Sequence, residues 1–215
     1  MVDLEFRFGN EITSEEDFSV LAAMLNEEWE NMIRISPQDL KSRLANAQKQ
    51  IVVAYSKITK EDIDYVSAKY GLTYSNKMIP VAIAETRSIF TGGDLGRIPK
   101  NYFDLTNKGV WAASNESDDT VIAVDITTLP TRKGDKGNGE ATRLMKHILG
   151  HVAYNCNAIK HIFTYTPDIQ GLINWHIKLG AVDTGYKIYG ARPGYGTPDV
   201  NVMDYSSLIK QLRSA

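Results

Sequence analysis

The most informative stretch of the chain is Thr128-Leu129-Pro130-Thr131-Arg132-Lys133-Gly134-Asp135-Lys136-Gly137-Asn138-Gly139. It follows a β-branched run at residues 121–126 and precedes residues 140–155, whose apolar side chains recur at helical spacing. Glycines allow the backbone to turn so that several N–H groups point into one concavity, and a following helix adds free N–H groups and the positive end of its dipole. The glycine-rich loop, residues 131–139, therefore predicts a site for phosphate or diphosphate.

Two familiar phosphate motifs do not fit this loop. The nucleotide motif G-x-x-x-x-G-K-[ST] fails because Gly139 is followed by Glu140, and the dinucleotide motif G-x-G-x-x-G fails because its third glycine is replaced by Thr142. A loop for another phosphate compound and a surface loop with basic tips remain as alternatives at this point. The loop has three basic residues, which we predict add positive charge where the anion binds: Arg132, Lys133 and Lys136.

The rest of the chain alternates between strand and helix patterns, which predicts one mixed α/β domain over residues 1–215. Strand patterns occupy residues 2–8, 51–55, 79–89, 121–126, 159–165, 183–189 and 200–205. Helix patterns occupy residues 13–25, 36–47, 140–155, 169–179 and 206–213, with a weaker one at 61–69. We expect insertions near residues 57–77 and 91–119, which are polar or rich in Gly, Asn and Asp. The last two strands are expected to pair with each other.

Composition and charge argue against several classes of protein. The chain has 215 residues, 43% hydrophobic and 23% charged, which is typical of a globular protein, and a formal net charge of -2 argues against broad binding to nucleic acid or anionic membranes. No stretch approaches about 18 consecutive apolar residues, and the N-terminus does not resemble a secretory signal. A single cysteine, Cys156, excludes an internal disulfide. We therefore expect a cytoplasmic protein.

The glycine-rich loop resembles the coenzyme A loop of the GCN5-related N-acetyltransferase (GNAT) family, R/Q-x-x-G-x-G/A between a strand and a helix. Gly137 and Gly139 occupy the two small-residue positions, while the position of the family's Arg or Gln is Gly134 here. Residues 174–181, NWHIKLGA, resemble the family's F-Y-E-K-L-G-F helix ending. The order of strands and helices from 121 to 181 also follows the family.

This resemblance implies a mixed α+β fold with a central mixed, splayed β-sheet flanked by helices on both faces. It implies acetyl-CoA as co-substrate, with pantetheine entering between the strands at 121–126 and 159–165 and pairing with the main chain of residues 127–129. A backbone N–H at or near Leu129 would polarise the thioester carbonyl, and the amides from Gly134 to Glu140 would hold the diphosphate. The residues expected at the cofactor are Thr127, Thr128, Leu129, Lys133, Gly134, Asp135, Lys136, Gly137, Asn138, Gly139 and Glu140.

The implied reaction is transfer of an acetyl or other acyl group from acyl-CoA to a primary amine of a small molecule or peptide, by direct attack in a ternary complex. The family's acid is often a tyrosine on the penultimate helix, and the matching position here is His176. For the base, often a strand carboxylate in the family, Asp125 and Glu85 are candidates. The alternative for His176 is a place on the helix surface or the core edge, and for each carboxylate solvent exposure or an arginine partner.

Other reactive side chains are interpreted as structural. His147 and His151 lie four residues apart, but no glutamate follows His147 and no third ligand is evident, so no metal site is expected. Cys156 lacks an evident activating partner. The resemblance further implies that two copies can pair as a homodimer. A non-catalytic module that senses acyl-CoA remains the alternative function, since Gly134 and His176 depart from the family's usual residues.

Overall fold

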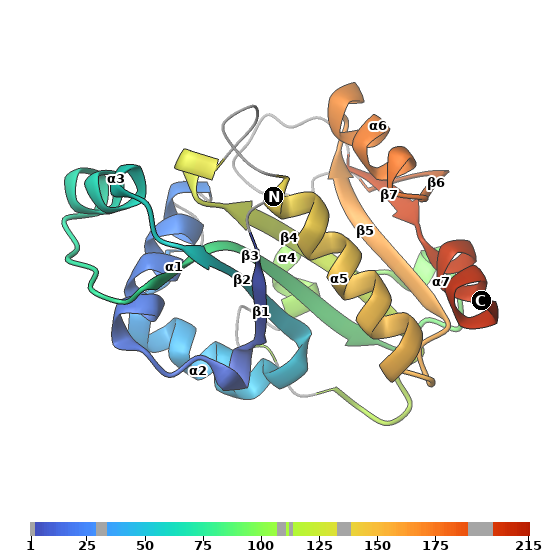
Figure 1. Ribbon diagram of the computed structural model, residues 1–215. Helices are drawn as coiled ribbons and strands as arrows, with labels where there is room; N and C mark the ends of the chain where they lie inside the picture. The colour runs from blue at the N-terminus through green and yellow to red at the C-terminus, as the bar shows by residue number, and fades with distance from the viewer. Residues whose placement is uncertain (1–2, 29–33, 107–110, 112–113, 133–138, 189–199) are drawn as a thin grey trace. The chain divides into compact units, whose positions relative to one another are not determined.

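The computed structural model describes residues 3–28, 34–106, 111, 114–132, 139–188 and 200–215 (Figure 1). Two compact units are distinguished. The first comprises Met1–Ala84 and Ile126–Met145, and the second comprises Glu85–Asp125 and Lys146–Ala215. The expectation of one domain over 1–215 stays a prediction.

Seven strands form a sheet in the order β1-β2-β3-β4-β5-β7-β6. The strands are β1 (Glu5–Phe8), β2 (Ile51–Lys57), β3 (Met78–Ile89), β4 (Thr120–Thr128), β5 (His161–Pro167), β6 (Val182–Ile188) and β7 (Val200–Asp204). The α-helices are α1 (Glu15–Glu28), α2 (Pro37–Ala47), α3 (Lys60–Tyr70), α4 (Tyr102–Thr106), α5 (Glu140–Asn155), α6 (Gln170–Lys178) and α7 (Ser206–Ser214). Short 3₁₀ helices are η1 (Gly9–Glu11), η2 (Gln48–Gln50), η3 (Leu95–Arg97) and η4 (Pro130–Arg132). The predicted class, a mixed α+β fold whose sheet is flanked by helices, is confirmed.

In the first unit, β2 lies in the core because every side chain from Ile51 to Ser56 is buried. β1 pairs with it antiparallel, from Glu5 opposite Tyr55 to Phe8 opposite Val52. The two predicted helix starts are confirmed. Ser14 Oγ accepts a hydrogen bond from Asp17 N at 3.4 Å before α1, and Ser36 Oγ accepts from Asp39 N at 3.1 Å before α2.

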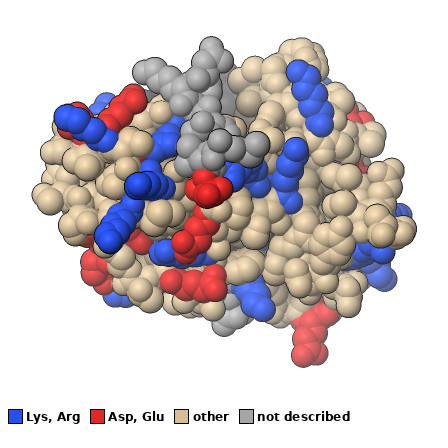
Figure 2. Space-filling model, in the orientation of Figure 1, with Lys and Arg blue, Asp and Glu red and all other residues tan. Residues whose placement is uncertain are grey.

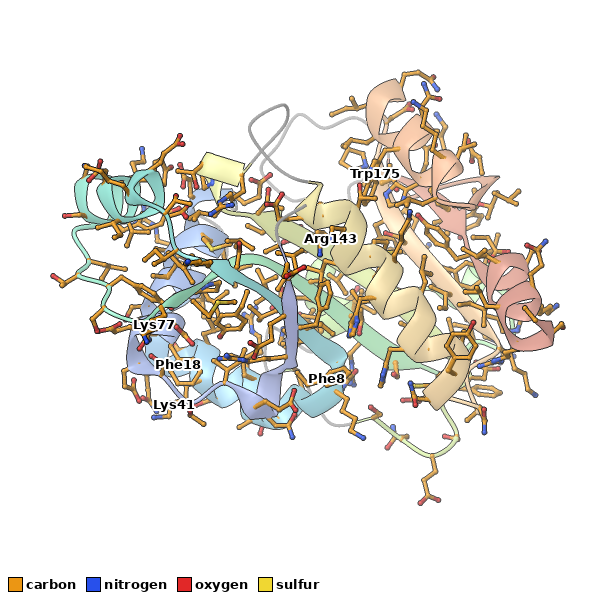
Figure 3. All side chains as sticks on the ribbon, viewed as in Figure 1. Phe8, Phe18, Lys41, Lys77, Arg143 and Trp175 are labelled. Atoms are coloured by element: carbon orange, nitrogen blue, oxygen red, sulfur yellow. The ribbon has the colours of Figure 1, made fainter. Side chains whose placement is uncertain are left out.

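A buried carboxylate links three parts of this unit. Asp17 on α1 accepts hydrogen bonds from Tyr55 Oη at 2.8 Å and Tyr74 Oη at 2.5 Å. Burial, followed by the nearby Asp17 charge, raises the pKa of Tyr55, so the phenol stays protonated and donates. Phe18 of the same helix is buried, and the Lys41 ammonium of α2 lies 5.6 Å from its ring centroid (both are labelled in Figure 3).

The weak helical pattern at 61–69 is a regular helix, α3, of 11 residues. Thr59 Oγ1 accepts from Asp62 N while the Asp62 carboxylate accepts from Thr59 N, a capping box at the start of the helix. Gly71 ends α3 in the left-handed conformation, with φ 66°. The insertion near 57–77 therefore contributes an ordered helix.

In the second unit, β4 and β5 pair in parallel from Thr120 opposite His161 to Ala123 opposite Thr164. Within this unit the parallel ladder ends at Ala123 and Thr164, although both strands continue. Such an end to the pairing is expected where two neighbouring strands splay apart. The predicted pairing of the last two strands is confirmed: β6 and β7 are antiparallel, and β7 lies between β5 and β6.

Element boundaries differ from the sequence prediction at a few ends. The strand expected from Ile159 begins at His161, because Ile159 N donates to Cys156 O in a turn at 3.0 Å. The strand expected from residue 2 is described from Glu5. Gly180 follows α6 with φ 99°, which agrees with its predicted role as the glycine that ends this helix.

The insertion near 91–119 is held to the second unit by polar contacts. The Asp119 carboxylate accepts from the main-chain N–H groups of Thr91 and Gly92, each at 3.0 Å. Tyr165 Oη on β5 donates to Pro99 O at 2.5 Å. No helix in the described ranges combines the length and apolar character that crossing a bilayer requires.

Two adjacent glycines in this insertion allow a test of the packing. Both have positive φ, but a Cβ at Gly93 would lie 2.7 Å from His161 Cε1, whereas the space beside Gly92 is open. We expect Gly92→Ala to cost about 1 kcal/mol from backbone strain. Gly93→Ala should cost a further 1–3 kcal/mol, roughly, because the imidazole must move. Urea unfolding of both variants measures the difference, and equal losses would contradict the contact with His161.

Candidate active site

The main-chain amide of Leu129, just before the glycine-rich loop, is hydrogen-bonded within the protein. Leu129 N donates to Val81 O on β3 at 2.9 Å, and Leu129 is completely buried. A main-chain acceptor therefore already occupies the Leu129 N–H, and the prediction that a backbone N–H at or near Leu129 polarises the thioester carbonyl stays a prediction. Any wider role of Leu129 at the cofactor stays a prediction.

The neighbouring amide, on Thr128, faces the opposite way. In an antiparallel pair, successive residues direct their main-chain groups to alternate sides of the strand. Because Leu129 N is directed at β3, we infer that Thr128 N points away from β3 and that Thr127 N shares the side of Leu129. Thr127 is 2% exposed. Among residues 127–129, we therefore expect the amide of Thr128 to be the one that meets a ligand adding as a strand.

The glycine-rich loop is described only at its two ends. The predicted cofactor contacts of Lys133, Gly134, Asp135, Lys136, Gly137 and Asn138 lie outside the described residues and stay predictions. Gly139 is exposed with φ 73°, a conformation that favours glycine. Its carbonyl accepts from Arg143 N at 2.9 Å in the first turn of α5 (Arg143 is labelled in Figure 3).

The positive charge of Arg132 is paired within the protein. Its side chain is 8% exposed, and Nη2 and Nε donate to the Asp62 carboxylate on α3 at 2.6 and 3.1 Å. Thr131 Oγ1 donates to the same carboxylate at 2.8 Å. The guanidinium is therefore engaged in a buried ion pair within the protein, and the prediction that Arg132 adds positive charge where the anion binds stays a prediction.

Glu140, the first residue of α5, belongs to the same cluster. Its Oε1 lies 3.8 Å from Arg132 Nη1, and both side chains are almost fully buried. The hydrogen bond to Asp62 raises the pKa of Arg132. Burial by itself would raise the pKa of Asp62, but hydrogen bonds from Arg132, Thr59 and Thr131 together hold it below its ordinary value. Asp62 and Arg132 are therefore both ionised near neutral pH.

In the second unit, His176 is a buried member of α6. It is 7% exposed, and its Nδ1 lies 2.7 Å from the hydroxyl of Tyr205, the residue after β7. Trp175 packs edge to face against the imidazole, with ring centroids 4.6 Å apart (Figure 3). The helix-surface interpretation of His176 is thus excluded, while its catalytic role stays a prediction.

Burial and the contact between His176 and Tyr205 determine which of their atoms carry protons. Burial lowers the pKa of His176 to about 4, so the ring is neutral at pH 7, and burial raises the pKa of Tyr205. A buried phenol requires an acceptor for its hydrogen, and His176 Nδ1 is the partner of Tyr205 in the described part of the chain. We therefore assign the ring proton to Nε2, which makes His176 a hydrogen-bond donor rather than a strong acid.

No protein-family model matches the sequence, and no curated protein matches it. Solved structures, by contrast, do match this chain. The loading GNATL domain of CurA from Lyngbya majuscula aligns with a TM-score of 0.61 at 12% identity, over 94% of this chain and 96% of that chain. NAA60 of Arabidopsis thaliana in complex with acetyl-CoA aligns with a TM-score of 0.58 at 9% identity, over 94% and 99%. The chain has the GNAT fold.

A further structure with this fold is the GphF GNAT-like decarboxylase in complex with isobutyryl-CoA. It aligns with a TM-score of 0.62 at 12% identity, over 94% of this chain and 97% of that chain. At these identities the likeness concerns the GNAT fold. The expectation of a GNAT-like splayed sheet came from the glycine-rich loop and from the helix ending at residues 174–181. It is confirmed as a statement about the fold.

The two candidate bases of this GNAT fold lie in different surroundings. Glu85 on β3 is 1% exposed, which excludes the solvent-facing interpretation for it. Asp125 on β4 is half-buried. Both make interactions within the protein, and the choice of either as base stays a prediction.

The remaining titratable side chains of the described residues form no cluster of metal ligands. Among the described residues, no group of three or more His, Cys, Asp or Glu side chains is arranged to hold a metal ion. Burial lowers the pKa of His147 on α5. On the face drawn in Figure 2, basic and acidic side chains are interspersed.

Sequence reasoning missed Tyr205 and Asp62. Tyr205 directly follows β7, in which Val200 to Met203 are all buried, so no alternation along the strand singled it out. The partner of Asp62 could not have been found from a local pattern either, because Arg132 follows 70 residues later.

The neutral state of His176 gives a test by pH. The folded state holds its pKa near 4 against an ordinary 6.5, so the unfolded state binds more protons between these values. His176 therefore makes the protein lose stability as the pH falls from 6.5 to 4, by roughly 3 kcal/mol. In His176→Phe, the free energy of unfolding should fall less over this window than in the parent. Urea unfolding at several pH values measures it, and parallel curves for the two proteins would contradict the assignment.

Proposed function

We propose that this protein transfers an acetyl or other short acyl group from acyl-CoA to a primary amine of a small molecule or peptide. The observation that carries this proposal is the hydrogen bond from Leu129 N to Val81 O on β3, from which we infer that the neighbouring Thr128 amide faces the other side. An extended pantetheine arm can pair with such an edge as a strand does. Two structures with the same fold are complexes with isobutyryl-CoA and acetyl-CoA, which supports the choice of ligand.

In the proposed reaction, the nitrogen of a neutral amine attacks the thioester carbonyl carbon. The carbonyl oxygen becomes an oxyanion, which the Thr128 N–H stabilises by a hydrogen bond. Collapse of the intermediate breaks the carbon–sulfur bond and releases the thiolate of coenzyme A. The amine loses its proton to a carboxylate, for which Asp125 and Glu85 are the candidates, and the thiolate takes up a proton from solvent.

The protonation of His176 restricts its role in this scheme. A ring with a pKa of about 4 is almost entirely neutral at pH 7, so it offers little acid for the departing thiolate. The proton on Nε2 can instead be shared in a hydrogen bond that stabilises negative charge without proton transfer. We therefore expect substitution of His176 to lower turnover without removing an inflection near pH 6.5.

A binding and turnover experiment tests the function. Calorimetric titration with coenzyme A, ATP and NAD is combined with thiol release from acetyl-CoA and isobutyryl-CoA over a panel of amines and peptides. Turnover supports the transferase. Binding of coenzyme A without turnover on any acceptor would favour the acyl-CoA sensor instead, and absence of coenzyme A binding would overturn both.

The amide of Thr128 can be tested by removing its hydrogen. Proline lacks the N–H and is tolerated at a strand end where that N–H is not part of the ladder. We expect Thr128→Pro to lower kcat roughly 10²–10³-fold, the range for loss of one oxyanion donor, with little change in the affinity for coenzyme A. Thr128→Val, which keeps the amide, is the matched control. Equal kcat values for the two variants would exclude this amide as the donor.

A further inference from the structure

We propose that Asp62 and Arg132 are positioning residues for coenzyme A: together with Glu140 they form an ionic cluster that fixes the two ends of the glycine-rich loop. Arg132 lies near the start of this loop and Glu140 directly follows it. Asp62 belongs to α3, within the insertion near 57–77. This inference rests on the proposed function, since it names residues that prepare the same site.

The contacts of Asp62 leave no capacity for a ligand. Its carboxylate accepts from Thr59 N at 2.9 Å, Thr59 Oγ1 at 2.7 Å, Thr131 Oγ1 at 2.8 Å and two nitrogens of Arg132. A carboxylate offers about four lone-pair positions, so these donors satisfy it. Asp62 is 0% exposed. Its role is therefore to cap α3 and to hold Arg132 and Thr131, not to bind substrate.

The energetics of buried charge favour a positioning role over a purely stabilising one. Desolvation of a buried ion pair offsets most of its Coulomb attraction, and packed apolar side chains of similar volume stabilise a protein about as well. What an Arg–carboxylate pair adds is a fixed geometry, because the planar guanidinium meets the two oxygens at defined angles. Here that geometry sets where the chain enters the glycine-rich loop.

Through Glu140, the ionic cluster also affects the charge at the start of α5. A carboxylate at the first residue of α5 places negative charge near the helix N-terminus, where the diphosphate is predicted to bind. Arg132 Nη1 lies 3.8 Å from Glu140 Oε1 and so balances this charge. Without Arg132, the Glu140 charge would oppose the diphosphate. Loss of Arg132 is therefore expected to weaken diphosphate binding in a way that removal of the Glu140 charge partly reverses.

The test compares ligands with and without the diphosphate. The variants are Asp62→Asn, Arg132→Gln and the double variant Arg132→Gln/Glu140→Gln, with Asp64→Asn on the exposed side of α3 as matched control. Calorimetry measures the Kd for coenzyme A, and thiol release measures kcat/KM for S-acetylpantetheine, which has no diphosphate. Circular dichroism shows which variants fold. If Arg132→Gln does not fold, Arg132→Lys replaces it, because lysine keeps the positive charge but lacks the planar guanidinium that meets both carboxylate oxygens.

We expect Asp62→Asn and Arg132→Gln to raise the Kd for coenzyme A roughly tenfold, the scale of one lost charge-assisted hydrogen bond. The kcat/KM for S-acetylpantetheine should stay within about twofold, Asp64→Asn should match the parent, and the double variant should regain part of the affinity lost in Arg132→Gln. Unchanged Kd values, or equal losses with both ligands, would overturn the positioning role while leaving the proposed function intact. A parent protein that does not bind coenzyme A would instead refute the proposed function.

Discussion

The hydrogen bond from Leu129 N to Val81 O is the constraint on which the candidate site depends. It extends the pairing with β3 beyond the end of β4, whereas the parallel ladder between β4 and β5 within the second unit ends at Ala123. One side of the end of β4 is therefore satisfied by the protein, and we infer that the amide of Thr128 faces the other side. A strand end that is paired on one side can pair on the other with an extended ligand that brings its own donors and acceptors.

The positive charge of Arg132, close to the start of the glycine-rich loop, is used inside the protein. Arg132 is a basic residue next to a predicted anion site, yet its guanidinium pairs with Asp62 and lies near Glu140. Electrostatics then acts on the ligand indirectly, through the position of the chain and through the balance of charge at the start of α5. This arrangement agrees with the lack of the family's Arg or Gln at Gly134, since main-chain amides can bind a diphosphate without a cationic side chain.

The order of elements could be predicted because it depends on local patterns. Alternation and helical spacing, together with the capping serines at 14 and 36, predicted every long strand and helix, and the pairing of β6 with β7 followed from their proximity in the chain. The roles of side chains at the site were predicted less well. The state of His176 depends on burial and on Tyr205, and neither can be read from the helix alone.

The sequence alone determined the fold class and the place of the glycine-rich loop between a strand and a helix, because glycine content and apolar periodicity are properties of neighbouring residues. Tertiary structure decided which polar groups remain available to a ligand. The N–H of Leu129 is hydrogen-bonded to Val81 O, and the guanidinium of Arg132 is paired with the Asp62 carboxylate. Burial lowers the pKa of His176, so its ring is a weak source of protons. Each outcome depends on a partner or an environment that residues distant in the chain supply, since hydrogen bonding and desolvation are set by spatial contact rather than by sequence spacing.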